Sequence, residues 1–153
     1  MGKLVVFYSR SGLTKQLGIE IARKLNADYE EIIDKKNRKN FLGFLISGYE
    51  AITQKLANIK NPEKDPQNYD LIIICSPVWA GSLSSPVRAY LKLYKDKIKK
   101  VAFVATCISE PGKIFEQMKQ ITKEPVSTIY FIDKDILNNS FVNDLDLFIK
   151  ALI

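Results

Sequence analysis

Five short apolar runs, separated by stretches with helical spacing, constrain the fold of this 153-residue chain more than any other feature. Most of the runs are continuously apolar, as expected of strands that are buried on both faces of a sheet. We expect strands over residues 3–8, 29–33, 69–75, 101–106 and 126–132. The spacing of apolar residues between these strands predicts helices over residues 14–25, 41–56, 84–94, 111–121 and 139–152.

Alternation of strands and helices is typical of a parallel sheet that is covered by helices on both faces. Right-handed crossovers then wind the chain into a doubly wound α/β sandwich. The length suits one domain, and we expect it to span residues 1–153. Ligands of such folds bind outside the carboxyl ends of the strands, so the loops after the first, third and fourth strands form the candidate site.

The predicted helix over residues 41–56 is unusually apolar in its first half, which reads FLGFLISG. Leu45, Tyr49, Ile52 and Leu56 share one side of this helix. We expect that side to pack into the core. The alternative is that it covers a ligand or a partner.

The absence of histidine excludes Ser-His-Asp hydrolysis, Cys-His proteolysis and any metal site that needs histidine. The two cysteines, Cys75 and Cys107, are too few for a disulfide framework or a thiolate-rich metal site. We expect them to be buried thiols, and whether they pair is left open. No metal site is expected, so the chemistry must come from acids, hydroxyls, backbone groups or a bound cofactor.

The net charge of the chain is +6, and basic residues gather over residues 35–39 and 95–100. These clusters are either solvated loops or a field that attracts an acidic partner or an anionic substrate. Nucleic acid is not expected, because no aromatic residues alternate with the basic ones. No run reaches the roughly 20 apolar residues of a membrane span. The N-terminus has no cleavable signal pattern, so we expect a cytoplasmic protein.

The loop after the first strand, SRSGLT, leads directly into a predicted helix N-terminus. Free backbone N–H groups and the helix dipole favour an anion there. Ser9, Ser11 and Thr14 add hydroxyls, Gly12 allows close backbone approach, and Arg10 can add positive charge. The loop therefore predicts a phosphate site, although it lacks the lysine of a triphosphate loop and the glycines of a dinucleotide fingerprint. The alternative is a capped helix without a ligand.

The loop after the third strand, SPVWAGSLSSP, contains Trp79, the only tryptophan. Its indole offers a flat face to a planar ligand, although it can equally be a lid over the core. The loop after the fourth strand, TCISEPG, can offer backbone N–H groups and the Thr106 hydroxyl. A phosphate site beside an aromatic plane fits a phosphorylated planar cofactor, and FMN is the candidate.

At these residues the chain resembles the flavodoxin family in its short-chain form. Trp79 and Gly81 match the family's flavin-stacking aromatic residue and the glycine near it. The family's N-terminal pattern is matched by Val5, Val6, Phe7, Ser9, Gly12, Thr14 and Ile21, with Gly18 in place of an alanine. The resemblance implies a five-stranded parallel sheet of order 2-1-3-4-5, with helices on both faces and FMN at the three loops.

The resemblance also assigns the FMN-binding residues, loop by loop. The phosphate would be held by Ser9, Arg10, Ser11, Gly12, Leu13 and Thr14. The ring would be bordered by Pro77, Val78, Trp79, Ala80 and Gly81, and along its other side by Thr106, Cys107, Ile108 and Gly112. A peptide beside the ring flips in this family to bind the semiquinone, and Ala80-Gly81 and Gly81-Ser82 are the matching candidates.

The function implied is that of a redox protein that carries electrons between partner proteins through the semiquinone and hydroquinone states of FMN. One alternative is an FMN-dependent NAD(P)H or quinone reductase of the same fold. A second is a flavin-free regulatory module. Two features argue against that module. Ser76 stands at the end of the third strand, where a phospho-receiver domain needs an aspartate, and the first loop lacks the cysteine that a phosphatase needs.

Two departures from the family pattern have functional consequences. The second loop carries no carboxylate and the third only Glu110, whereas flavodoxins are usually acidic. We therefore expect a less negative low-potential couple than in an acidic flavodoxin, and an acidic partner. Residues 106–112 also contain no aromatic residue, which predicts an outer flavin face open to a nicotinamide or a quinone.

Overall fold

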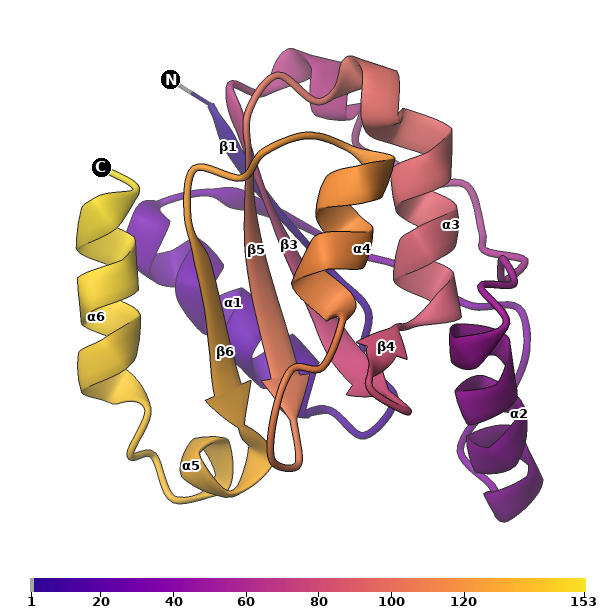
Figure 1. Ribbon diagram of the computed structural model, residues 1–153. Helices are drawn as coiled ribbons and strands as arrows, with labels where there is room; N and C mark the ends of the chain where they lie inside the picture. Colours follow the sequence, from indigo (N-terminus) through magenta and orange to yellow (C-terminus); the bar gives the residue numbers. More distant parts are fainter. Residues whose placement is uncertain (1) are drawn as a thin grey trace.

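The computed structural model describes residues 2–153 as a central sheet between two layers of helices (Figure 1). Its parallel strands are β1 (Lys3–Phe7), β2 (Asp28–Glu31), β3 (Leu71–Trp79), β5 (Val101–Cys107) and β6 (Thr128–Ile132). They lie in the order β2-β1-β3-β5-β6. A short strand, β4 (Ser82–Leu83), pairs antiparallel with the end of β3.

This arrangement confirms the doubly wound α/β fold but corrects the predicted five-strand sheet, because β4 makes a sixth strand. Strand β3 continues to Trp79 and turns back through Ala80 and Gly81, so most of the predicted second loop is a hairpin. Both turn residues have positive φ, 48° at Ala80 and 70° at Gly81, as a tight two-residue hairpin turn requires. The sequence Ala-Gly is not a strong signal for that turn, which is why the hairpin was missed.

Helices cover both faces of the sheet. One face carries α1 (Leu13–Leu25), α5 (Asp133–Leu137) and α6 (Val142–Ala151). The other face carries α2 (Phe41–Ile52), α3 (Ser85–Tyr94) and α4 (Ile114–Ile121). Two short 3-10 turns, η1 (Pro66–Asn68) and η2 (Lys95–Lys97), flank β3 and α3 along the chain. The predicted last helix is preceded by a further short helix, α5, which the sequence did not predict.

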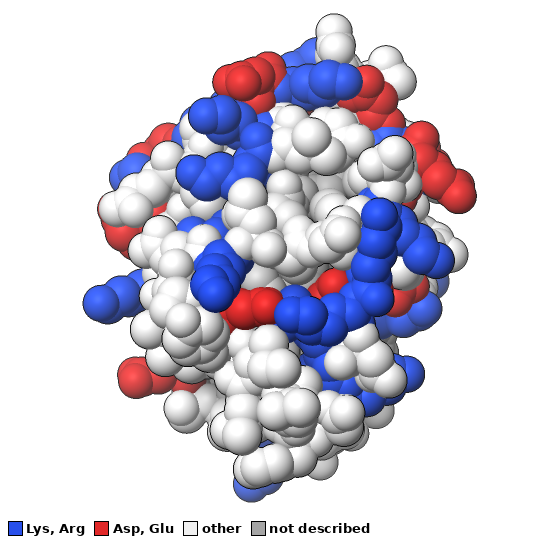
Figure 2. Space-filling view, turned by 90° about the vertical axis from the view of Figure 1, so that its right-hand side faces the viewer, with Lys and Arg blue, Asp and Glu red and all other residues white. Residues whose placement is uncertain are grey.

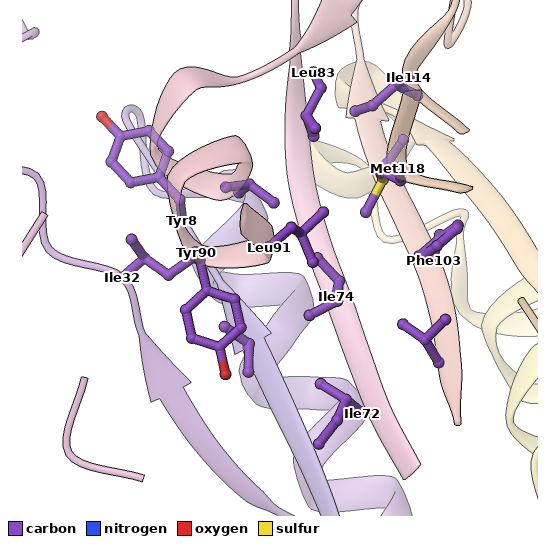
Figure 3. Packing of buried hydrophobic residues seen from close by; sticks show 14 of the residues in the cluster. Tyr8, Ile32, Ile72, Ile74, Leu83, Tyr90, Leu91, Phe103, Ile114 and Met118 are labelled. Atoms are coloured by element: carbon purple, nitrogen blue, oxygen red, sulfur yellow. The ribbon is translucent and has the colours of Figure 1, made fainter. Parts of the chain in front are cut away.

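The central strands are buried on both faces, as their continuous apolar runs predicted. Val5, Ile73 and Ala102 occupy neighbouring register positions and belong to the core cluster beneath α1 and α6. The next residue along each of these three strands points to the other face of the sheet, where it belongs to a second core cluster beneath α3 and α4. Figure 3 shows Leu91 of α3 and Met118 of α4 reaching toward the sheet in this second cluster.

Helix α1 packs as its spacing predicted. Its buried stripe includes Leu17, Gly18, Ile21 and Leu25. A Cβ atom at Gly18 would lie 2.5 Å from a ring carbon of Phe7. The Phe7 ring therefore leaves no space for a side chain at this position. The departure from the family's alanine affects the packing of the helix only.

Helix α2 contradicts the prediction that its apolar side packs into the core. The apolar side chains assigned to the core, Leu45, Tyr49, Ile52 and Leu56, are each more than half exposed. The helix instead buries a side made of small and polar residues, which are Gly43, Ser47, Glu50 and Ala51. It also ends at Ile52, before the predicted end of the helix.

The two cysteines are buried and free, so they do not pair. In the parallel register Cys75 lies opposite Val104, which precedes Cys107 by three residues on β5. Burial raises the pKa of Cys75, and it raises the pKa of Cys107 to about 11 with the help of Asp133 and Glu110. Both thiols therefore stay protonated at neutral pH. Within residues 2–153, no helix is long and apolar enough to span a membrane.

Candidate functional site

A pocket of about 380 Å³ lies at the carboxyl ends of β1, β3 and β5, where a doubly wound fold binds its ligands. Its volume is within the roughly 300–1,000 Å³ range of small-molecule sites. The three predicted loops form one side of the pocket and α2 forms another. Predicted site residues that line it are Arg10, Ser11, Leu13, Thr14, Pro77, Val78, Trp79, Ala80, Thr106, Cys107 and Ile108.

The other predicted site residues, Ser9, Gly12, Gly81 and Gly112, support the loops without lining the pocket. The Gly12 N–H donates a hydrogen bond to Ser9 Oγ over 3.0 Å. A Cβ atom at Gly112 would lie 2.3 Å from the carbonyl oxygen of Gly81. Gly112 is therefore required where the third loop packs against the hairpin turn, and its predicted role in binding the cofactor stays a prediction.

The first loop presents an open helix N-terminus to the pocket. Gly12 is the N-cap of α1, with a left-handed φ of 104°, and no side chain within residues 2–153 caps the helix there. The Thr14 hydroxyl lies 2.8 Å from the hydroxyl of Thr106, which joins the first loop to the end of β5. The free N–H groups of the first turn and these hydroxyls form a set of donors suited to an anion.

Arg10 lies between the first loop and α2. Its guanidinium carbon is 5.0 Å from the centre of the Phe44 ring, a cation–π arrangement, and both residues line the pocket. The positive charge of Arg10 is thus held at the pocket wall by an aromatic residue from a different element.

Trp79 covers the core and also lines the pocket, and its stacking on a planar ligand stays a prediction. It is the last residue of β3 and only 8% exposed. The Tyr8 ring packs edge-on against it at 5.5 Å, and the Arg38 guanidinium lies 5.3 Å from its ring centre. Burial, and then the nearby Asp34, raise the pKa of Tyr8 to about 12, so this tyrosine is neutral.

A buried ionic cluster holds Arg38 beside Trp79. Arg38 is 3% exposed and forms ion pairs with Asp34 and, over 2.6 Å, with Glu50 of α2. Glu50 also accepts hydrogen bonds from Lys36 at 2.9 Å and from Ser85 at 3.0 Å. Burial alone would raise the pKa of Glu50, but these partners outweigh it and hold that pKa below its ordinary value.

The ionic cluster explains the orientation of α2. A buried carboxylate is costly unless it is paired, so the side of α2 that carries Glu50 must face Arg38. Ser47, on the same side, accepts a hydrogen bond from Arg38 at 3.3 Å. The apolar side of the helix is therefore left toward the pocket and the solvent.

Several pocket-lining residues lie outside the three predicted loops. They are Phe44, Leu45, Ser47, Gly48, Tyr49 and Ile52 of α2, and Asp133 after β6. The apolar sequence of α2 was the available signal, because covering a ligand was the alternative to core packing. Asp133 begins α5 directly after β6 and therefore lies outside the three predicted loops. Burial raises the pKa of this carboxyl group.

The absence of an aromatic residue in the third loop does not leave the pocket without one. Ile108, which stands in that loop, is 84% exposed at the pocket. Phe44 and Tyr49 reach the pocket from α2 instead. The aromatic surface near the site therefore comes from Trp79 and from α2.

Comparison with solved structures shows that several flavoproteins share this fold. A flavoprotein from Lactobacillus acidophilus, solved in complex with FMN, is similar with a TM-score of 0.75 and 21% identity, over 95% of this chain and 98% of that one. Flavodoxin 1 from Bacillus cereus is similar with a TM-score of 0.56 and 16% identity, over 99% and 96% of the two chains. The sequence matches no protein-family model and no curated protein.

A third similar structure is an NADH:FMN oxidoreductase, with a TM-score of 0.54 and 13% identity over 99% of this chain and 90% of that one. All three likenesses extend over nearly the whole chain. The fold is therefore flavodoxin-like, in agreement with the resemblance noted in the sequence.

Proposed function

We propose that this protein binds FMN in the pocket and carries electrons between partner proteins. The observation that carries the proposal is the meeting of an uncapped helix N-terminus, rich in hydroxyls, with Trp79 in a single pocket. The first feature suits a phosphate group and the second a planar ring. The likeness to a flavoprotein solved with FMN supports the same cofactor.

The phosphate of FMN would be held by the first turn of α1 together with Ser11, Thr14 and Arg10. Trp79 would border the ring, and the aromatic side chains of α2 would limit the access of water to it. Bound FMN would supply the redox chemistry. The role of the protein is then to bind and orient the cofactor and to control what reaches it.

One of the two candidate peptides next to the ring is fixed in place. The Gly81 carbonyl accepts a hydrogen bond from the Lys113 N–H over 2.8 Å, which holds the Gly81-Ser82 peptide. We therefore propose Ala80-Gly81 as the peptide that can reorient toward the cofactor. Ala80 already has a positive φ of 48°, which is uncommon for a residue other than glycine.

Titration of the protein with FMN tests the proposal, with the fluorescence of Trp79 as the readout. Since Trp79 is the only tryptophan, its quenching reports binding at this pocket. We expect saturable quenching and, for Ser11→Ala, about tenfold weaker binding because one phosphate hydrogen bond is lost. Leu147→Ser, an exposed change on α6, serves as the control. Absence of quenching would reject the FMN site and favour the flavin-free alternative.

A second candidate function is an FMN-dependent reductase for a nicotinamide or a quinone. The observation in its favour is the third loop, which has no aromatic residue and carries the largely exposed Ile108 at the pocket. Rapid mixing of the FMN-loaded protein with NADPH separates the two functions. Fast direct bleaching of the flavin would contradict a pure carrier, and no bleaching would contradict an NADPH-linked reductase.

The positive charge of the chain has consequences for its redox partner and for its reduction potential. With a net charge of +6 and no carboxylate in the hairpin, we propose an acidic redox partner and a low-potential couple that is less negative than in acidic flavodoxins. A potentiometric titration that gives an equally negative value would contradict this. We further propose that residues 1–153 form one domain and act in the cytoplasm.

A further inference from the structure

Helix α2 carries an unusually apolar outer surface. Phe41 is 76% exposed, and the other large apolar side chains of this region are also more than half exposed. We call this set the α2 surface; it consists of Phe41, Leu42, Phe44, Leu45, Tyr49, Ile52 and Leu56. Contiguous apolar surface of this kind usually marks an interaction site.

The pocket accounts for only part of the α2 surface. Phe44, Leu45, Tyr49 and Ile52 line the pocket, whereas Phe41, Leu42 and Leu56 do not. The residues outside the pocket lie at or just beyond the two ends of the helix, and Phe41 is the most exposed member of the set. A ligand in the pocket would therefore leave both ends of the surface uncovered.

The charges around the α2 surface are mostly positive. Two of the nearby carboxylates, Asp34 and Glu50, face inward and are paired with Arg38. A third, Asp133, lies at the pocket that the α2 surface helps to line. The lysines that flank the helix in sequence, Lys35, Lys39 and Lys55, are exposed. Figure 2 shows the side of the molecule on which α2 lies, with a largely uncharged lower part whose upper border is mostly Lys and Arg, with some Asp and Glu among them.

The shape and charge of the α2 surface select among its conceivable occupants. A second copy of this chain would bring like-charged lysines together, which is unfavourable. A protein partner would need a groove shaped to this projecting helix (Figure 1), whereas a lipid bilayer adapts to any convex apolar ridge. Lysines beside such a ridge attract anionic headgroups while their stems lie along the apolar boundary.

We propose that the α2 surface docks this protein onto the surface of an anionic lipid bilayer. Phe41 and Leu42 enter the boundary between headgroups and acyl chains, and the flanking lysines contact the headgroups. Because four residues of the α2 surface also line the pocket, docking brings the pocket mouth to the lipid surface. The docking needs no cofactor and is independent of the proposed function.

Sedimentation of the full chain with vesicles tests this docking. The probes are vesicles of phosphatidylcholine alone and of phosphatidylcholine with phosphatidylglycerol in equal parts. We expect binding to the anionic vesicles, weakened by salt, and little binding to the neutral ones. The double variant Phe41→Ser/Leu42→Ser should bind about tenfold more weakly or worse, because the inserted apolar area is lost.

A matched control is Leu137→Ser/Leu147→Ser, which removes two exposed leucines from α5 and α6 and should leave vesicle binding unchanged. Circular dichroism and the thermal midpoint of each variant establish that it is folded, and its FMN titration separates this test from that of the cofactor site. Failure of the folded wild type to bind either vesicle would overturn the proposal. Undiminished vesicle binding by the Phe41/Leu42 variant would also overturn it, because such binding would rest on charge attraction alone. Self-association that the same variant abolishes would instead assign the α2 surface to a second copy.

Discussion

Helices α1 and α2 have similar lengths and clear apolar sides, but they use those sides in opposite ways. Helix α1 buries its apolar stripe against the sheet, with Leu17 and Ile21 fully enclosed. Helix α2 buries Ser47 and Glu50 and exposes its leucines and aromatic residues. Amphipathic spacing therefore identifies the two sides of a helix, but it does not determine which side faces the protein.

The N-termini of the two helices also differ, because one is capped by a side chain and the other is not. In α2 the Asn40 side chain accepts a hydrogen bond from the Gly43 N–H over 2.6 Å, so the helix is capped by its own chain. In α1 the N-cap is Gly12, which has no side chain to offer. The open end belongs to the helix that points at the pocket, which leaves its donors available to a ligand.

The largest effect is expected from Arg38→Met, which removes the cation from the buried cluster. Asp34 and Glu50 would lose their shared partner, and breaking such a buried pair typically costs about 3–5 kcal/mol. Urea unfolding measures the loss. Since Trp79 contacts Arg38, its emission should also change in the folded variant.

Arg38→Lys is the matched control for this variant, since it keeps the charge but not the planar group. It should lose less stability than Arg38→Met. Unchanged stability and unchanged Trp79 emission in Arg38→Met would show that the cluster does not hold α2.

Leu17→Ala against Leu42→Ala tests the comparison of the two helices directly. Leu17 is fully buried in α1, so its truncation should cost about 2–5 kcal/mol. Leu42 is exposed on α2, and its truncation should change the stability by at most about 0.5 kcal/mol. Chemical denaturation measures both, and a similar cost for the two variants would contradict the inverted packing of α2.

Acid should weaken the attachment of α2 before that of α1. The pKa of Glu50 is lower in the folded protein than in the unfolded chain, so its pairing stabilises the fold above its unfolded pKa of about 4.3. This contribution is lost as the pH falls through the lower, folded pKa. Trp79 emission followed from pH 7 downward should report the change, and Glu50→Gln should flatten that part of the curve.

The smallest effect is expected from Asn40→Ala, which removes the side-chain cap of α2. Loss of an N-cap typically costs about 1 kcal/mol. Amide exchange in the first turn of α2 should become faster, while exchange in α1 stays the same. Equal protection of α2 with and without Asn40 would show that the cap contributes nothing there.

Much of the site could be predicted from local sequence. The first loop places hydroxyls, a glycine and a helix start within a few residues, so its chemistry is readable without the fold. The residues contributed by α2 and Asp133 could not be found in this way. They reach the pocket only because strands and helices distant in sequence are packed side by side.

The role of Gly112 illustrates the same limit. In the sequence it is a loop glycine that the resemblance assigns to the cofactor, and the fold shows that it also makes room for the backbone of Gly81. That contact joins two loops about thirty residues apart. The residues next to a glycine in the sequence do not show which residue packs against it in the fold.

The sequence by itself determined the five parallel strands, the winding of the sheet, the buried stripe of α1 and the chemistry of the first loop, because these depend on contacts within a few residues or on continuous apolar runs. Only the tertiary structure decided which way α2 faces and that Trp79 lies beside Arg38. The physical reason is that a buried charge must be paired, and Glu50 of α2 finds its partners in Arg38 and Ser85, from two other segments that meet it only in the folded chain. That pairing turns the apolar side of α2 outward, to the pocket and to the surface proposed to meet the lipid.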